Sequence, residues 1–227
     1  EVLHPKIAQI FNRYSLVYRL YSFLRLRSYC LVVAAESPPY VIRAHYYPMA
    51  AQSLTNLELN IKFIDSLPVN IRSNVRVKPY PDTGWNTAQK YLERYGTEMV
   101  VKNLNLLQSF RRANVIVCTY PETTFSEAMA SGIPTILLFN PIYYERHPIC
   151  DELVSEMISV NIIFYNYHDA AKHLSRYWHD MGSWWFSPET VKVRNKFLAT
   201  ALSKTNDWLN RWASIVSNTK HVPTFPK

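Results

Sequence analysis

Apolar residues form two alternating patterns along the chain: short continuous runs and longer stretches with three- and four-residue spacing. The continuous runs predict buried strands over 29–35, 74–77, 115–119, 135–139 and 162–165, and a weaker one over 98–102. The spaced stretches predict helices over 5–28, 49–66, 87–95, 104–113, 124–130, 149–159, 169–180 and 188 to about 212. Strands that alternate with helices indicate an α/β fold, with a Rossmann-like, mostly parallel sheet and helices on both faces.

Composition narrows the kind of ligand site. The 227 residues include only 4 Gly, and neither a dinucleotide-binding nor a P-loop glycine motif occurs. The net charge of +8 favours anionic partners, and the first 30 residues hold five Lys or Arg against the single acid Glu1. The 3 Cys lack a C-x-x-C pair and the histidines lack metal-ligand spacing, so we expect no disulfide framework and no metal.

Polar side chains gather where the strand over 115–119 ends and a short helix begins. Glu122, Thr123, Thr124 and Glu127 lie in this turn, and two interpretations remain open. Thr124 and Glu127 match a capping box, in which a Thr and a Glu three residues later satisfy backbone N–H groups. In the other interpretation, the hydroxyls and helix amides hold a phosphate or diphosphate, and Glu127 accepts from ribose hydroxyls. Ligands of open α/β sheets bind at such strand ends.

Three other polar loops also follow predicted strands, so we expect their residues at the same edge of the sheet. The candidates in these loops are Ser37, Arg43, Lys78, Tyr80, Trp85 and His147. The cations and the serine would meet a phosphate, the aromatic rings would stack on a base or sugar, and the histidine would contact a base or carry a proton. The simpler interpretation is a set of ordinary side chains on stiff surface loops.

These motifs together resemble the nucleotide-binding half of GT-B glycosyltransferases. A closer resemblance, over about residues 30–200, is to the transferases of bacterial surface-carbohydrate biosynthesis that were first grouped from a spirochaete sequence. Its motifs here are Ser37-Pro-Pro-Tyr, Lys78-Pro-Tyr-Pro-Asp-Thr-Gly-Trp, Glu122-Thr-Thr-x-x-Glu, Gly132-Ile-Pro-Thr and Trp184-Trp-x-Ser-Pro. The second motif departs from the family's usual Arg-x-Tyr-Pro-x-Asp-Tyr-Gly-Trp at its start and at Thr83.

The resemblance implies a glycosyltransferase without metal or other cofactor. Its donor would be a nucleotide-activated sugar, and its acceptor a glycan or lipid-linked glycan. In the superfamily, the Glu at the position of Glu127 contacts the donor ribose, and the turn at the position of Thr123 and Thr124 lies against the phosphates. GT-B enzymes have two Rossmann-like halves. We therefore expect only the donor-binding half here and assign no catalytic base, because the acceptor half often supplies it.

The resemblance also implies a domain organisation. We expect a Rossmann-like domain over 30–215, preceded by a basic, aromatic helix over 1–29 and followed by a tail over 216–227. The helix would bridge to a second half, although Arg beside Tyr and Phe also suits a peripheral membrane contact. The cysteine usage, and the lack of a signal peptide or a long apolar run, favour the cytoplasm or the inner face of the membrane.

Two alternatives remain open. A nucleotide-sugar epimerase or polyol-phosphate transferase would use the same fold. A basic, non-enzymatic module would instead bind nucleic acid or anionic lipid, and its binding would depend steeply on salt. The sequence contains no helix-turn-helix, RNA-recognition or zinc pattern, so we expect no nucleic-acid partner.

Overall fold

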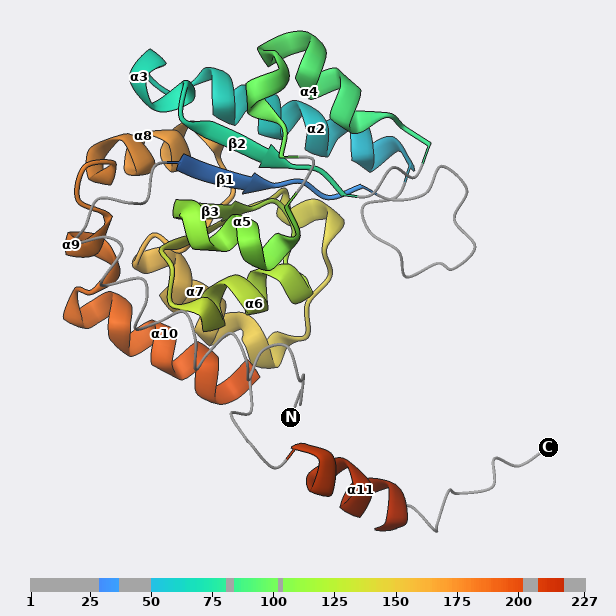
Figure 1. The fold of residues 1–227 in the computed structure, drawn as a ribbon. Helices are drawn as coiled ribbons and strands as arrows, with labels where there is room; N and C mark the ends of the chain where they lie inside the picture. The colour runs from blue at the N-terminus through green and yellow to red at the C-terminus, as the bar shows by residue number, and fades with distance from the viewer. Residues whose placement is uncertain (1–28, 37–49, 81–83, 102–103, 202–207, 219–227) are drawn as a thin grey trace.

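Five parallel strands form one sheet in the order β2-β1-β3-β4-β5 in the computed structural model, which describes residues 29–36, 50–80, 84–101, 104–201 and 208–218 (Figure 1). The strands are β1 (Tyr29–Val33), β2 (Val75–Lys78), β3 (Ala113–Cys118), β4 (Thr135–Leu138) and β5 (Ile163–Phe164). Every neighbouring pair in this order is parallel. The predicted α/β class with a mostly parallel sheet is therefore confirmed.

Helices cover both faces of the sheet. The helices are α2 (Ala50–Asp65), α3 (Val69–Arg72), α4 (Thr87–Tyr95), α5 (Leu106–Arg112), α6 (Thr123–Ser131), α7 (Asp151–Ser159), α8 (Tyr167–Tyr177), α9 (Met181–Trp185), α10 (Pro188–Ala201) and α11 (Trp208–Asn218). On one face, α2 contacts α8. On the other, α10 contacts α6 and α7, and α5 lies against β1 and β3 (Figure 1). Strands β1, β4 and β5 are buried throughout and β3 nearly so, which explains their continuous apolar runs, whereas β2 alternates buried and half-buried residues.

The strand order creates a switch point between β1 and β3. The chain winds outward from β1 to β2 in one direction, and from β3 through β4 to β5 in the other, so the loops after β1 and β3 diverge. Thr119 joins these two strand ends: its Oγ1 donates to the carbonyl of Val33 at 3.0 Å and accepts from the N–H of Ala35 at 3.2 Å. One buried hydroxyl thus ties together the ends of β1 and β3, at the position where such sheets usually bind ligands.

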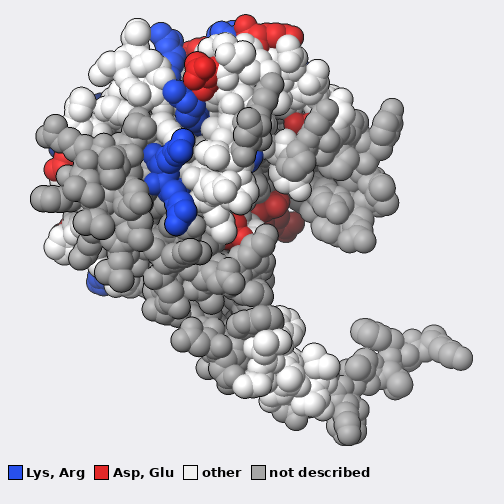
Figure 2. All heavy atoms as spheres, viewed as in Figure 1, with Lys and Arg blue, Asp and Glu red and all other residues white. Residues whose placement is uncertain are grey.

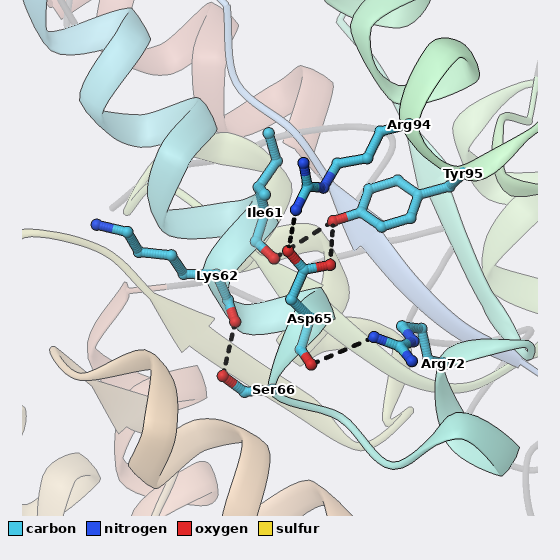
Figure 3. A network of polar contacts seen from close by, with 7 residues as sticks. All are labelled: Ile61, Lys62, Asp65, Ser66, Arg72, Arg94 and Tyr95. Atoms are coloured by element: carbon cyan, nitrogen blue, oxygen red, sulfur yellow. Dashed lines mark hydrogen bonds and ion pairs between the residues drawn. The ribbon is translucent and has the colours of Figure 1, made fainter.

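A polar network holds α3 and α4 at the carboxyl-terminal end of α2 (Figure 3). The carboxylate of Asp65 accepts from Arg94 at 2.6 Å and from the hydroxyl of Tyr95 at 2.9 Å. Arg72 donates to the backbone carbonyl of Asp65 at 3.4 Å. Because α2 runs back along the sheet against the strand direction, this anchored end lies at the amino edge. The first turns of α2 therefore lie at the carboxyl edge.

The two adjacent tryptophans are structural anchors. Trp184 donates from Nε1 to the carbonyl of Val160, and Trp185 donates to the carbonyl of Gly132, each at 2.8 Å. Gly132 ends α6 with a φ of 74°, a conformation that glycine adopts without strain. The guanidinium of Arg194 lies 3.9 Å from the centre of the Trp185 ring. Both rings are buried, so Trp184 connects α9 to the end of α7 and Trp185 connects it to the end of α6 and to α10, rather than forming a surface for sugars.

Several sequence-based boundaries were wrong. The strand expected over 98–102 is a 3₁₀ turn, η1 (Thr97–Met99), followed by a single bridge between Val100 and Val77. The long final helix expected from 188 to about 212 is described as two helices, α10 and α11, and residues 202–207 between them are not described. The basic helix expected over 5–28 lies outside the described residues.

Candidate functional site

The turn between β3 and α6 opens at the carboxyl edge of the sheet. The N-cap of α6 is Glu122, and its side chain makes no capping hydrogen bond. Its backbone carbonyl instead accepts from the N–H groups of Phe125 at 3.0 Å and Ser126 at 3.3 Å. Thr123 and Thr124 therefore lie inside the first turn of the helix. The capping-box interpretation of Thr124 and Glu127 is wrong because neither threonine is the N-cap.

The first turn of α6 contains backbone N–H groups that lack an acceptor among the described residues. Nothing in the described part of the chain accepts from the backbone N–H groups of Thr123 and Thr124. The Oγ1 of Thr124 lies 3.1 Å from the hydroxyl of Tyr120, and Thr123 is exposed. No acidic residue occupies the first turn. Such a helix end presents partial positive charge and free N–H groups, which is the arrangement that binds phosphates.

Tyrosines and one carboxyl group surround this helix end. Burial raises the pKa of Tyr120 to about 12, and the nearby Glu122 and Tyr80 contribute in the same direction. Burial also raises the pKa of Tyr144, and Glu122 and Tyr120 add to that effect. Burial raises the pKa of Glu122 itself. The loops after β2, β3 and β4 follow parallel strands and so lie along the same carboxyl edge of the sheet. The roles of Tyr80 and Glu122 toward a donor stay predictions.

Glu127 lies deeper in the fold. It is in the second turn of α6 and only 6% exposed. Burial raises the pKa of Cys118, and the Glu127 carboxyl group adds to that effect, so Glu127 lies near the end of β3. The carboxyl group thus lies behind the helix end, toward the sheet. Its contact with a donor ribose stays a prediction.

The ammonium group of Lys78 hydrogen-bonds to backbone carbonyls of the chain. Its Nζ donates to the carbonyl of Leu104 at 2.5 Å and to that of Val101 at 3.5 Å, and burial lowers its pKa. It closes β2 beside the end of β1, where the N–H of Ala34 donates to its carbonyl at 3.0 Å. One ammonium proton remains beyond these two bonds. Its role toward a phosphate stays a prediction.

The remaining sequence candidates are spread out. His147 is exposed, and its Nδ1 accepts from the N–H of Ile149 at 3.2 Å at the start of the 3₁₀ turn η3 (Pro148–Cys150). Among the described residues, no hydrogen bond or ion pair joins His147 to the α6 turn. Trp85 is partly buried. Ser37 and Arg43 lie outside the described residues.

A pocket of about 160 Å³ lies between α2 and the loops after β4 and β5. Residues of α2 and of the loops after β4 and β5 line it: Thr55, Asn56, Leu59, Asn140, Tyr143, Tyr144 and Tyr165. Tyr144 lines the pocket, and Glu122 adds to the effect of burial in raising its pKa. Sequence reasoning missed the pocket. Its α2 residues lie within an ordinary helical pattern, and only the folded chain brings them beside the loop after β4.

Two general properties of the described ranges bear on the site. His, Cys, Asp and Glu side chains do not gather there in groups that could hold a metal ion. None of the helices in those ranges combines the length and apolar character needed to cross a membrane.

A search of solved structures matches the chain to two proteins at low sequence identity. The C-terminal CMP-Kdo binding domain of WaaA from Acinetobacter baumannii is 11% identical, and the match covers 84% of this chain and 98% of that domain with a TM-score of 0.42. The wall teichoic acid polymerase TagF is 12% identical, and the match covers 96% of this chain and 52% of that chain with a TM-score of 0.44. Both TM-scores are low, so the fold assignment rests on the strand order of the chain itself.

Sequence comparison identifies the family. No curated protein matches the sequence. A family model described as LIC12162 family transferase matches residues 25–216, which include every described strand and the α6 turn. The chain therefore belongs to the LIC12162 family of transferases.

Proposed function

We propose that the chain is the donor-binding half of a GT-B glycosyltransferase. It would bind a nucleotide-activated sugar at the carboxyl edge of the sheet and present it to a glycan or lipid-linked acceptor. The observation that carries this proposal is the first turn of α6, whose free N–H groups open beside the switch point between β1 and β3. This is where open α/β sheets bind ligands and where helix ends bind phosphates. Membership in a transferase family supports a group-transfer reaction.

The proposed chemistry assigns separate tasks to the groups at this edge. When the bond between the anomeric carbon and the donor phosphate breaks, its electron pair stays on the phosphate oxygen. The N–H groups of Thr123 and Thr124 would stabilise that charge, because donors fixed in advance need no reorganisation during the reaction. The carboxyl group of Glu122 would accept from donor hydroxyls rather than meet the phosphate. The acceptor oxygen forms the new bond, and its proton goes to a base that we leave unassigned.

The hydroxyl of Thr124 offers a direct test. Calorimetric titration with UDP-, GDP-, CDP- and CMP-sugars should find at least one that binds in the micromolar range. Thr124→Val keeps the shape but removes the hydroxyl, and it should weaken that binding about tenfold. Thr200→Val is the matched control: Thr200 is exposed in α10, and its hydroxyl bonds only to its own helix at 2.8 Å. If none of these donors binds to the unaltered chain, the proposal is wrong.

A further inference from the structure

We propose that the outer edge of β5 binds an acidic, extended segment of a partner protein, which adds a strand to the sheet in the groove beside α8. β5 is the last strand in the described sheet, so this site lies at the side of the sheet and not at its carboxyl edge. The inference is therefore independent of the proposed function. A bound segment would leave the α6 turn free for a donor.

A groove of about 480 Å³ runs along this edge. Residues of β5 and of its two flanking helices line it, from Ile158 at the end of α7 to the α8 residues between Asp169 and Tyr177. Eight helical steps in α8 span about 12 Å. About four residues of extended chain have the same length. The groove therefore has the size of a short peptide segment.

The edge of β5 has backbone groups that face away from the sheet. The carbonyls of Ile162 and Phe164 accept from N–H groups in and just after β4, at 2.8 and 3.3 Å. The N–H of a trans peptide unit points opposite to its carbonyl, so the N–H groups of Ile163 and Tyr165 point away from β4. Neither finds an acceptor among the described residues. Such an edge is a template for an added strand, which supplies matching backbone groups.

Apolar side chains lie exposed beside the same edge. Ile158 is 40% exposed and Tyr165 is 37% exposed, and both line the groove. The apolar residues of β1, β3 and β4 are all buried. A segment paired with β5 would cover the two exposed side chains, and this burial would add affinity to the backbone hydrogen bonds.

The α8 wall favours an acidic segment. Lys172 and Arg176 line the groove one helical turn apart, and neither forms an ion pair among the described residues. The guanidinium of Arg176 lies 5.3 Å from the centre of the Tyr177 ring. Between the two cations, the Nε2 of His173 is buried without a hydrogen-bond partner in the described ranges. Against these groups the groove has one acid, Asp169, so a carboxylate on the bound segment would meet a net positive wall.

Two blocked pentapeptides test the proposal on the unaltered chain. One is acetyl-Thr-Val-Glu-Val-Thr-amide, and the other has Lys in place of Glu. In an NMR titration, the Glu peptide should shift the amide resonances of Ile163 and Tyr165 and bind at least about fivefold more tightly than the Lys peptide. Absence of binding, equal affinity for the two peptides, or shifts confined to other elements would overturn the inference.

Charge reversals on α8 locate the preference. Lys172→Glu and Arg176→Glu should each bring the affinities for the two peptides within about twofold of each other. Lys90→Glu is the matched control, because Lys90 is exposed on α4 and forms no ion pair among the described residues. This variant should keep the preference. A preference as strong in both α8 variants as in the control would contradict the inference.

The backbone donor is tested by a second pair of variants. Tyr165→Pro removes an N–H that points away from β4, and Tyr165→Ala removes the same ring but keeps the N–H. Tyr165→Pro should weaken the Glu peptide at least about threefold more than Tyr165→Ala does. Equal weakening would overturn strand addition. If Tyr165→Pro does not fold, the α8 variants still decide, because Lys172 and Arg176 are exposed.

The edge could instead pair with a second copy of the chain, and sedimentation distinguishes this case. We expect the unaltered chain to show no self-association that depends on β5. Self-association that Lys172→Glu and Arg176→Glu leave unchanged but Tyr165→Pro abolishes would assign the edge to a second copy and overturn the inference.

Discussion

The two edges of the sheet use their polar groups in different ways. At the amino edge, Arg76 donates from Nη1 to the carbonyls of Val75 at 2.8 Å and Ser73 at 3.0 Å. Arg111 and Arg112 end α5, where cations suit the negative end of the helix dipole. Figure 2 shows Lys and Arg side chains gathered in a column on the face that carries α5. Cations at this edge stabilise chain turns and helix ends.

The carboxyl edge offers unused donors instead. The N–H groups of Thr123 and Thr124 and the Nδ2 of Asn56 find no acceptor among the described residues. These groups come from two distant elements, α6 and α2, which both begin at the carboxyl edge of the sheet. The comparison teaches that net charge is a poor guide to the position of this site. Donors left without partners are the better guide.

The largest expected effect comes from placing a charge at each edge. Thr123→Glu adds a carboxylate in the first turn of α6 and should weaken nucleotide-sugar binding about a hundredfold, because like charges in contact cost several kcal/mol. Folding should not suffer, since an acid at a helix N-terminus adds about 0.3–1 kcal/mol of stability. Calorimetry and urea unfolding on the same variant separate the two effects.

Arg112→Glu is the matched control at the amino edge. It changes the net charge by twice as much as Thr123→Glu does. Arg112 is exposed on α5, away from the α6 turn. We expect less than about a twofold change in affinity at physiological salt, because distant surface charges are screened. A larger loss with Arg112→Glu than with Thr123→Glu would reverse the comparison.

Acid should weaken the fold through a histidine in α8. His173 is 8% exposed among aromatic rings, and burial, with a smaller contribution from Arg176, lowers its pKa to about 4. An unfolded histidine has a pKa of about 6.5. Between about pH 6.5 and pH 4, the imidazole is therefore protonated in the unfolded state but neutral in the folded state. Stability should therefore fall as pH drops from about 6.5 to 4, by about 2–3 kcal/mol in total.

Urea unfolding at pH 7 and pH 4.5 measures this loss. His173→Phe should remove most of its pH dependence, whereas His179→Gln, at an exposed histidine just beyond α8, should retain it. An equal loss of stability in His173→Phe and the unaltered chain would rule out His173 as the source.

The network at the other end of α2 should affect stability without affecting binding. Asp65→Ala removes the acceptor of Arg94 and Tyr95 and should lower the free energy of unfolding by about 1–2 kcal/mol. Nucleotide affinity should stay the same, because Asp65 lies at the amino edge. Glu152→Ala is the control: its ion pair with Lys196 is also 2.6 Å long, but its side chain is 79% exposed. That change should cost about half as much or less.

The smallest expected effect concerns the hydroxyl beside the first turn of α6. Tyr120→Phe removes the contact with Thr124 and should lower the free energy of unfolding by about 0.5–1 kcal/mol. Affinity for the nucleotide-sugar should fall only a few-fold, because the backbone donors remain. An affinity loss as large as that of Thr123→Glu would mean that the tyrosine, and not the helix end, carries the binding.

Local signals predicted the elements well. The helix expected over 87–95 matches α4, and the unit of β3, α6 and β4 lies within two residues of the expected boundaries. Periodicity works here because these elements bury a clear apolar face. The strand expected over 98–102 failed because its apolar residues pack beside β2 with only one bridge, at Val100. A local pattern does not show how many partners a strand finds.

The site was predicted only in part. The turn over 122–124 was found because its polar residues interrupt two apolar runs. The helix start was misplaced, because Thr and Glu spacing cannot distinguish a cap from the first turn. Asn56 and Tyr144 were missed for a different reason: they lie 88 positions apart in the sequence. Their meeting depends on the first turns of α2 lying at the carboxyl edge beside the loop after β4, which is a property of the tertiary fold.

The most direct test of the anion site is the amide spectrum of the chain during a titration with inorganic pyrophosphate. We predict that the backbone N–H resonances of Thr123 and Thr124 shift and saturate together, while those of Arg111 and Arg112 stay in place. Shifts concentrated at the amino edge, with the α6 turn unmoved, would contradict the account.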